Sequence, residues 1–158
     1  MGTILIAGLL IGLGGTIAMD IWALALNRLL GLPLPNWGFV GRWVAHLRHG
    51  TVFHNAISDA APVPREAIIG WVFHYAVGLA YGVMFVAIAG PSWLAAPTFF
   101  PAWVFAIVTI GAGWFLLHPG LGLGWALSKT PTPWKNRCFG LLAHTVFGIG
   151  LWATALVT

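Results

Sequence analysis

Four ionisable residues lie singly in four apolar stretches of this 158-residue chain: Asp20, His74, His118 and His144. Three imidazoles and one carboxylate can complete the tetrahedral sphere of zinc, while two imidazoles and a carboxylate suit iron and leave open positions. An ionisable group at membrane depth is costly and by default marks a functional site. We therefore predict that these four residues bind a transition metal ion, namely zinc, iron or copper.

The spacing of these four residues from the basic residues predicts that they share one depth. Each lies seven to eleven positions from the nearest Lys or Arg. In a helix with a rise of ~1.5 Å per residue, such offsets correspond to roughly 10–16 Å. In helix bundles, metal ligands come from facing helices, so the absence of closely spaced histidines within one stretch does not argue against the site.

Other functions of the same residues stay open at this stage. His74 and His144 can be axial ligands of a haem, although four helices leave little room to enclose the macrocycle. Asp20 and the histidines can form the proton relay of a proton-coupled transporter. The chain can also be a non-catalytic accessory subunit of a larger membrane complex, or each His can make a single interhelical hydrogen bond. The residues do not decide whether the protein is an enzyme, since lipid or small-molecule chemistry and metal handling both fit a metal site.

A second, weaker group of candidate metal ligands lies between the first two apolar stretches. It consists of His46, His49, His54 and Asp59. His46 and His49 are three residues apart and share one face of a helix. A cytoplasmic metal-uptake site is one interpretation of this group, and a solvated or lipid-headgroup role is the other.

The composition predicts an all-α integral membrane protein with a single four-span domain over residues 1–158. Hydrophobic residues make up 59% of the chain and charged residues 6%, whereas a soluble domain carries about 25% charged residues. A helix needs ~20 apolar residues to cross the hydrocarbon core. We expect a bundle of four transmembrane helices at about 3–30, 67–89, 98–127 and 138–157.

The basic residues predict the topology of these spans. All seven lie in or beside the segments that join spans one to two and three to four: Arg28, Arg42, Arg48, Arg65, Lys129, Lys135 and Arg137. By the positive-inside rule, both segments are cytoplasmic and both termini are periplasmic. The charge therefore reflects membrane topology, and we expect a lipid bilayer rather than nucleic acid as the partner.

Three local patterns refine this picture. The cytoplasmic loop 31–66 contains a predicted interfacial amphipathic helix at 36–48, with an apolar face that includes Val40 and Trp43. Pro119 is expected to break the third span near 119. Paired glycines four residues apart, at 8 and 12 and at 78 and 82, favour close helix packing within the bundle or a homo-oligomer contact.

Several short motifs recur in this order in one family. They are Met19-Asp-Ile-Trp22, Gly41-Arg-Trp43, Phe53-His54, Gly70-Trp-Val-Phe-His-Tyr75, His118-Pro-Gly120, Ser128-Lys-Thr-Pro-Thr-Pro-Trp134 and Leu142-Ala-His144. Over nearly its whole length the chain resembles the small bacterial inner-membrane proteins grouped as domain of unknown function 2938. The resemblance implies a bacterial inner membrane location and a short multi-span fold. It implies nothing about chemistry.

Overall fold

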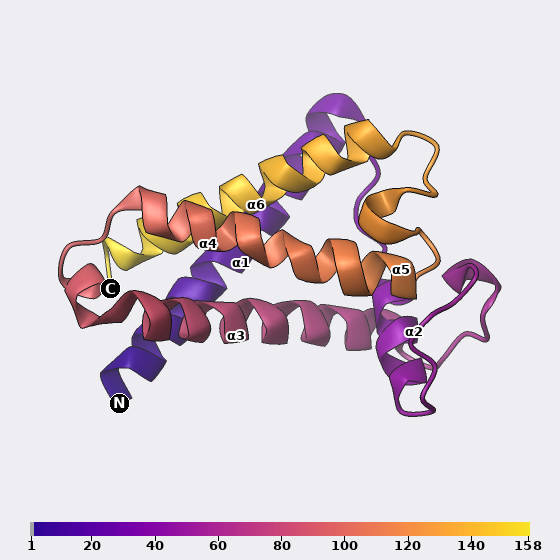
Figure 1. Cartoon of the computed structure of the whole chain (residues 1–158), viewed down its shortest axis with the longest axis horizontal. Helices are drawn as coiled ribbons and strands as arrows, with labels where there is room; N and C mark the ends of the chain where they lie inside the picture. The colour runs from indigo at the N-terminus through magenta and orange to yellow at the C-terminus, as the bar shows by residue number, and fades with distance from the viewer. Residues whose placement is uncertain (1) are drawn as a thin grey trace. The chain divides into compact units, whose positions relative to one another are not determined.

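The computed structural model of the chain describes residues 2–158 and, apart from Thr3, their side chains. The regular structure over these residues is helical, as predicted, and residues 2–158 contain no strand. In chain order, and as labelled in Figure 1 where there is room, the elements are α1 (Gly2–Leu30), α2 (Trp37–Leu47), η1 (Ile57–Asp59), α3 (Glu66–Ala95), α4 (Phe99–Ala112), the π-helical turn η2 (Gly113–Leu117), α5 (His118–Gly120), η3 (Trp125–Leu127) and α6 (Pro133–Ala155).

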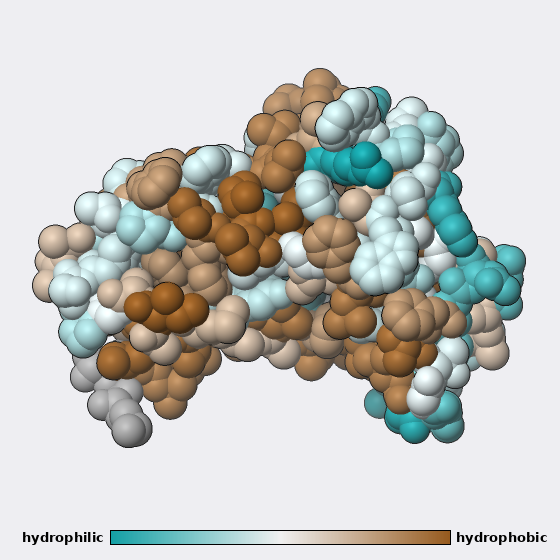
Figure 2. Space-filling model, viewed as in Figure 1, coloured by the Kyte–Doolittle hydropathy of each residue, from teal (hydrophilic) through white to brown (hydrophobic). Residues whose placement is uncertain are grey.

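Four helical stretches of the described residues are long and apolar enough to cross a membrane, which confirms the predicted number of spans. They are Ile4–Leu30, Glu66–Ala95, Phe99–Gly120 and Pro133–Ala155. Large apolar side chains on them stay exposed, such as Ile88 (71%) and Val108 (70%), and brown, hydrophobic residues cover much of the surface seen in Figure 2. Water would disfavour such a surface and lipid accepts it. The chain is therefore a membrane protein.

The second span differs in length from its predicted range of 67–89. In α3 the residue that follows this range, Gly90, has φ +81° and lies outside the helical region, and Pro91 comes next. Glycine tolerates this conformation because it lacks a Cβ. Residue 89 therefore marks the end of the straight part of α3, and a short kinked continuation reaches Ala95.

The third span was expected at 98–127, but its helix ends at Gly120. This end lies one residue after Pro119, where the break was predicted. A proline ring clashes with the carbonyl four residues earlier, and the π-helical turn Gly113–Leu117, in which the His118 N–H bonds to the Gly113 carbonyl, widens the helix just before the proline. The chain then turns at Gly122, which has φ +85°.

By its internal packing the chain divides into two compact units. The first, which we call the bundle unit, comprises residues 2–34, 75–109 and 141–158. In it α1 packs on α3 through the two glycine pairs: a Cβ on Gly12 would overlap the Gly78 carbonyl, and a Cβ on Gly82 would overlap the Gly8 carbonyl. The glycine spacing therefore serves helix packing within one chain.

The remaining helix pairs of the bundle unit close a ring. A Cβ on Gly150 of α6 would come within 2.7 Å of Gly15 of α1, and one on Gly148 would come within 2.9 Å of the backbone of Trp103 in α4. On α3, Phe85 packs against Phe105 of α4 with ring centroids 5.1 Å apart. The order α1, α3, α4, α6 and back to α1 forms a four-helix bundle around a core that includes Ile11, Val86, Ala106 and Leu151.

The second unit, which we call the loop unit, comprises residues 35–74 and 110–140. Its helix α2 is capped by Asn36, whose side chain accepts a bond from the Phe39 N–H at 3.2 Å. The helix approaches the start of α3 so closely that a Cβ on Gly41 would overlap the Glu66 carbonyl. Glycines thus bring these two backbones together.

The apolar face of α2, predicted to rest on the membrane surface, is instead partly covered by the chain itself. Val40 is 6% and Trp43 is 3% exposed. Trp43 belongs to a core cluster with Ile57 and Leu121, and its indole N–H donates to the Val52 carbonyl at 2.8 Å. The reason is that the segment after α2 folds back over the helix, which the spacing of apolar residues cannot reveal.

Candidate functional site

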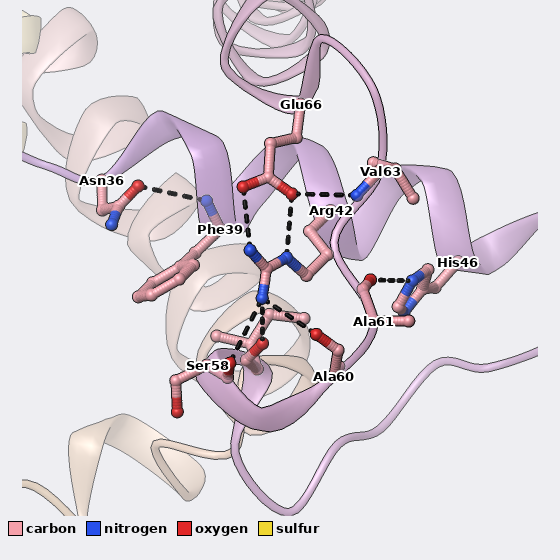
Figure 3. Close-up of polar contacts among 10 residues, drawn as sticks. Asn36, Phe39, Arg42, His46, Ser58, Ala60, Ala61, Val63 and Glu66 are labelled. Carbon is pink, nitrogen blue, oxygen red and sulfur yellow. Dashed lines mark hydrogen bonds and ion pairs between the residues drawn. The ribbon is translucent and has the colours of Figure 1, made fainter.

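The loop unit is organised around the guanidinium of Arg42, which is 8% exposed. Arg42 forms a bidentate pair with the Glu66 carboxylate, with both N–O distances 2.9 Å. Its Nη1 also donates to the carbonyls of Ile57, Ser58 and Ala60 at 3.0, 3.3 and 3.0 Å, as Figure 3 shows in part. The hydrogen bonds to Glu66 raise the pKa of Arg42 against the opposing effect of burial. A permanently charged group therefore fixes the path of residues 57–60.

Two histidines of the loop unit face each other next to this network. Nδ1 of His46 lies 2.9 Å from Nε2 of His54. The outer ring nitrogens each meet a backbone carbonyl: His46 Nε2 lies 3.0 Å from the Ala61 oxygen, as in Figure 3, and His54 Nδ1 lies 2.9 Å from the Gly120 oxygen. A carbonyl only accepts hydrogen bonds, so both outer nitrogens carry hydrogen. In neutral rings the two inner nitrogens are then the ones that hold lone pairs.

The other two members of the weaker predicted group make different contacts. His49 accepts a bond from Nε of Arg48 at 3.0 Å, and Asp59 accepts one from the Ser58 hydroxyl at 2.9 Å. Across residues 2–158, no group of three or more His, Cys, Asp or Glu side chains is arranged to hold a metal ion. The structure therefore brings together two of these four residues, His46 and His54.

In the bundle unit, Asp20 of α1 has a partner that the sequence did not indicate. The phenol of Tyr75 on α3 donates to Oδ2 of Asp20 at 2.7 Å, a length typical of a bond to a charged acceptor. The sequence did contain one sign of this pair: Tyr75 lies in a stretch without charges. A buried phenol usually finds a hydrogen-bond partner, so a polar partner on another span could have been expected. The carboxylate is thereby held between two spans.

His144 of α6, also in the bundle unit, is tied to α4. Its Nδ1 lies 2.8 Å from the Ala106 carbonyl and 3.3 Å from Oγ1 of Thr109. The Thr109 hydroxyl donates to the same carbonyl at 2.7 Å, so its oxygen can only accept from the imidazole. Nδ1 therefore carries hydrogen, and in the neutral ring Nε2 holds the lone pair.

The other two intramembrane histidines lie in the loop unit. His74 stacks on Trp37 with ring centroids 4.0 Å apart and meets the edge of Trp71 at 5.8 Å. His118 follows the π-helical turn, and its carbonyl accepts a bond from the Leu123 N–H at 2.9 Å. The structure thus describes Asp20 and His144 in one unit and His74 and His118 in the other. Their role as one metal-binding set stays a prediction.

Comparison with known proteins assigns a family and no activity. A search of curated proteins and a search of solved structures found no similar chain. The sequence pattern of one family matches residues 9–158, which is nearly the whole chain. This match agrees with the resemblance of the short motifs. The chain belongs to the family described as Protein of unknown function (DUF2938).

Proposed function

We propose that this protein is a multi-pass protein of the bacterial inner membrane, with both termini periplasmic, that binds a transition metal ion and serves in metal handling. The placement of all seven basic residues in or beside two of the three connecting segments supports this orientation. Fusing a periplasm-dependent reporter to the C-terminus tests it. An active phosphatase fusion is expected, and an inactive fusion in a stable protein would reverse the topology.

The observation that carries the metal proposal is the state of the histidine rings. Three histidines direct one ring nitrogen at a backbone carbonyl: His144 at Ala106, His54 at Gly120 and His46 at Ala61. Metal-binding histidines in proteins almost always donate the second ring N–H to a carbonyl or carboxylate, which fixes the tautomer and turns the other nitrogen towards the metal. Among the predicted intramembrane ligands, His144 therefore has the tautomer that metal binding needs, as His46 and His54 have in the loop unit.

Within the membrane, the ligands that we propose are those predicted from the sequence: Asp20, His74, His118 and His144. Neutral imidazoles add no charge to the apolar medium, and a bound cation would offset the Asp20 carboxylate. The Tyr75 bond occupies one side of Oδ2, and a carboxylate has four lone-pair sites on its two oxygens. The Tyr75 bond by itself therefore does not prevent Asp20 from binding a metal.

Elemental analysis of the full-length protein, purified in detergent without chelators, tests this function. We expect a transition metal in the wild-type protein and a lower metal content in Asp20→Asn and in His144→Gln. Tyr81→Phe is the matched control, since Tyr81 lies on α3 as Tyr75 does and contacts the ring of Phe105. Metal at the level of the buffer blank in the wild-type protein would overturn the proposal, as would full metal content in both ligand variants.

One observation favours proton-coupled transport as a second candidate. The Tyr75–Asp20 bond joins two protonatable groups of different spans, which is an arrangement that proton pathways in membranes use. Proteoliposomes with an internal pH dye would take up protons when a gradient is applied, and Asp20→Asn would abolish the uptake. Equal proton flux in Asp20→Asn would remove this candidate.

A further inference from the structure

We infer that His46 and His54 form a second metal site, in the loop unit, for a divalent ion that prefers nitrogen ligands, such as Zn²⁺, Cu²⁺ or Ni²⁺. The inference does not rest on the intramembrane ligands of the proposed function. The two histidines come from different segments, the end of α2 and the loop before η1. The geometry between their rings is what points to a bound cation.

The facing nitrogens are fixed as lone-pair donors by what the opposite side of each ring touches. Because the Ala61 and Gly120 carbonyls hold the outer N–H groups, neither ring can turn its N–H inwards without losing that bond. The inner nitrogens, 2.9 Å apart, then present two lone pairs to each other, an arrangement that repels. A positive species between them removes the repulsion, and a metal ion binds both.

The rings lie nearly end to end, with the inner nitrogens 2.9 Å and the ring centroids 5.1 Å apart, so each ring must turn to aim its lone pair at a metal ion beside the line between the nitrogens. Bonds of about 2.0–2.1 Å to two nitrogens 2.9 Å apart enclose an angle of about 90°, as in square or octahedral coordination. Tetrahedral zinc needs a separation of about 3.3 Å, which such a turn of the rings also supplies. The contact between the rings is only partly buried, so water can fill the remaining positions and the metal can exchange.

The supports of the two rings are themselves held in place. Arg42 binds the carbonyls of residues 57, 58 and 60, directly before the Ala61 carbonyl that orients His46. The Gly120 carbonyl accepts both the Nδ1 bond and the backbone N–H of His54, at 2.9 and 3.1 Å. A Cβ on Gly120 would overlap the Trp43 ring, so close packing locks that residue. Ligands that are oriented before binding give a tighter site.

Titration of the full-length protein in detergent with Zn²⁺ alone, followed by calorimetry, tests this site. We expect His46→Ala and His54→Ala each to weaken one binding event by more than about tenfold, because one of two protein ligands is lost. His49→Ala is the matched control and should leave Zn²⁺ binding unchanged, since its Nε2 accepts from Arg48. Asp20→Asn should leave this event intact, which separates the loop site from the intramembrane one. Equal Zn²⁺ affinity in wild type, His46→Ala and His54→Ala would overturn the inference.

A measurement on the wild-type protein keeps the inference testable if the variants do not fold. Cu²⁺ bound to the loop site should show hyperfine coupling to two imidazole nitrogens in electron paramagnetic resonance. Zn²⁺ should also protect His46 and His54, and not His49, from acylation by diethyl pyrocarbonate, as read by mass spectrometry. Acylation of His46 and His54 at the same rate with and without saturating Zn²⁺ would refute the site and show that only a proton is shared between the rings.

Discussion

The bundle unit and the loop unit satisfy their polar groups in different ways. In the bundle, backbone groups bond within helices, and polar side chains make contacts between two spans, such as Tyr75 to Asp20 and His144 to Ala106 and Thr109. In the loop unit, one side chain, Arg42, serves three carbonyls and a carboxylate. The irregular chain between α2 and α3 leaves carbonyls that no helix satisfies, so side chains must do so. The extended side-chain hydrogen-bond network of this protein therefore lies where its backbone is irregular.

Removal of the Arg42 side chain should have the largest effect. Arg42→Ala would leave the partly buried Glu66 carboxylate and three carbonyls without this donor, and each polar group left without its partner costs roughly 1–3 kcal/mol, or more if it is charged. We expect the loop 48–65 to become sensitive to proteinase K, which does not require an arginine, while α1, which lies in the bundle unit, stays protected. Mass spectrometry of the fragments measures this directly.

The matched control for this variant is Arg48→Ala. Arg48 is exposed and follows α2, and exposed substitutions usually stay within about 0.5 kcal/mol. If Arg42→Ala and Arg48→Ala were cleaved at the same rate within loop 48–65, the loop would not depend on the Arg42 network. The contrast between the two units would then be wrong.

A side chain at a close helix contact should have the next largest effect. In Gly82→Ala the new Cβ would overlap the Gly8 carbonyl in the bundle, and overpacking typically costs about 1–3 kcal/mol. Gly111→Ala is the control, because its Cβ would meet only Phe115 at 3.8 Å and alanine is favoured over glycine in a helix by about 1 kcal/mol. Unfolding in detergent should give free-energy changes of opposite sign. Changes of the same sign would contradict the assigned packing of α1 on α3.

Much of the fold could be predicted from composition alone. Four charge-poor stretches, with basic residues in two of the three segments that join them, indicate four spans, and Gly90 directly follows the predicted end of the second. What the sequence could not show was the π-helical turn before Pro119. A proline in an apolar run predicts a break, and the helix does end at Gly120, but the π-helical turn Gly113–Leu117 just before the proline was not predicted. That adjustment depends on backbone hydrogen bonds, which leave no periodic pattern.

The candidate sites were less predictable, since they depend on contacts distant in sequence. His46 and His54 could be grouped by residue type. Their rings are oriented, however, by the backbone carbonyls of residues 61 and 120. Every residue has a carbonyl, so the sequence does not show which ones orient a histidine. Residue type also suggested His49 as a metal ligand, but its Nε2 accepts a hydrogen bond from the neighbouring Arg48. In the membrane, Asp20 was expected to bind a metal or to belong to a proton relay, and the nearby phenol of Tyr75 was overlooked.

The smallest effect should come from Tyr75→Phe in the bundle. Side-chain hydrogen bonds between membrane helices contribute about 0.6 kcal/mol on average and up to about 1.7 kcal/mol, because the unfolded chain in the membrane also finds partners. The short contact of Tyr75 with a carboxylate favours the upper part of this range. Unfolding in mixed micelles measures it, and Tyr81→Phe on the same helix should change stability by less.

A double-mutant cycle with Asp20→Asn separates the pair from other effects at these positions, since it isolates the interaction energy of two residues in contact. If the bond is part of the fold alone, the coupling should persist whether or not transition metal is bound. If Asp20 also binds a metal, as proposed, metal would draw charge from the carboxylate and weaken the acceptor that Tyr75 uses. The coupling should then fall in the metal-loaded protein, and an unchanged coupling would count against Asp20 as a ligand.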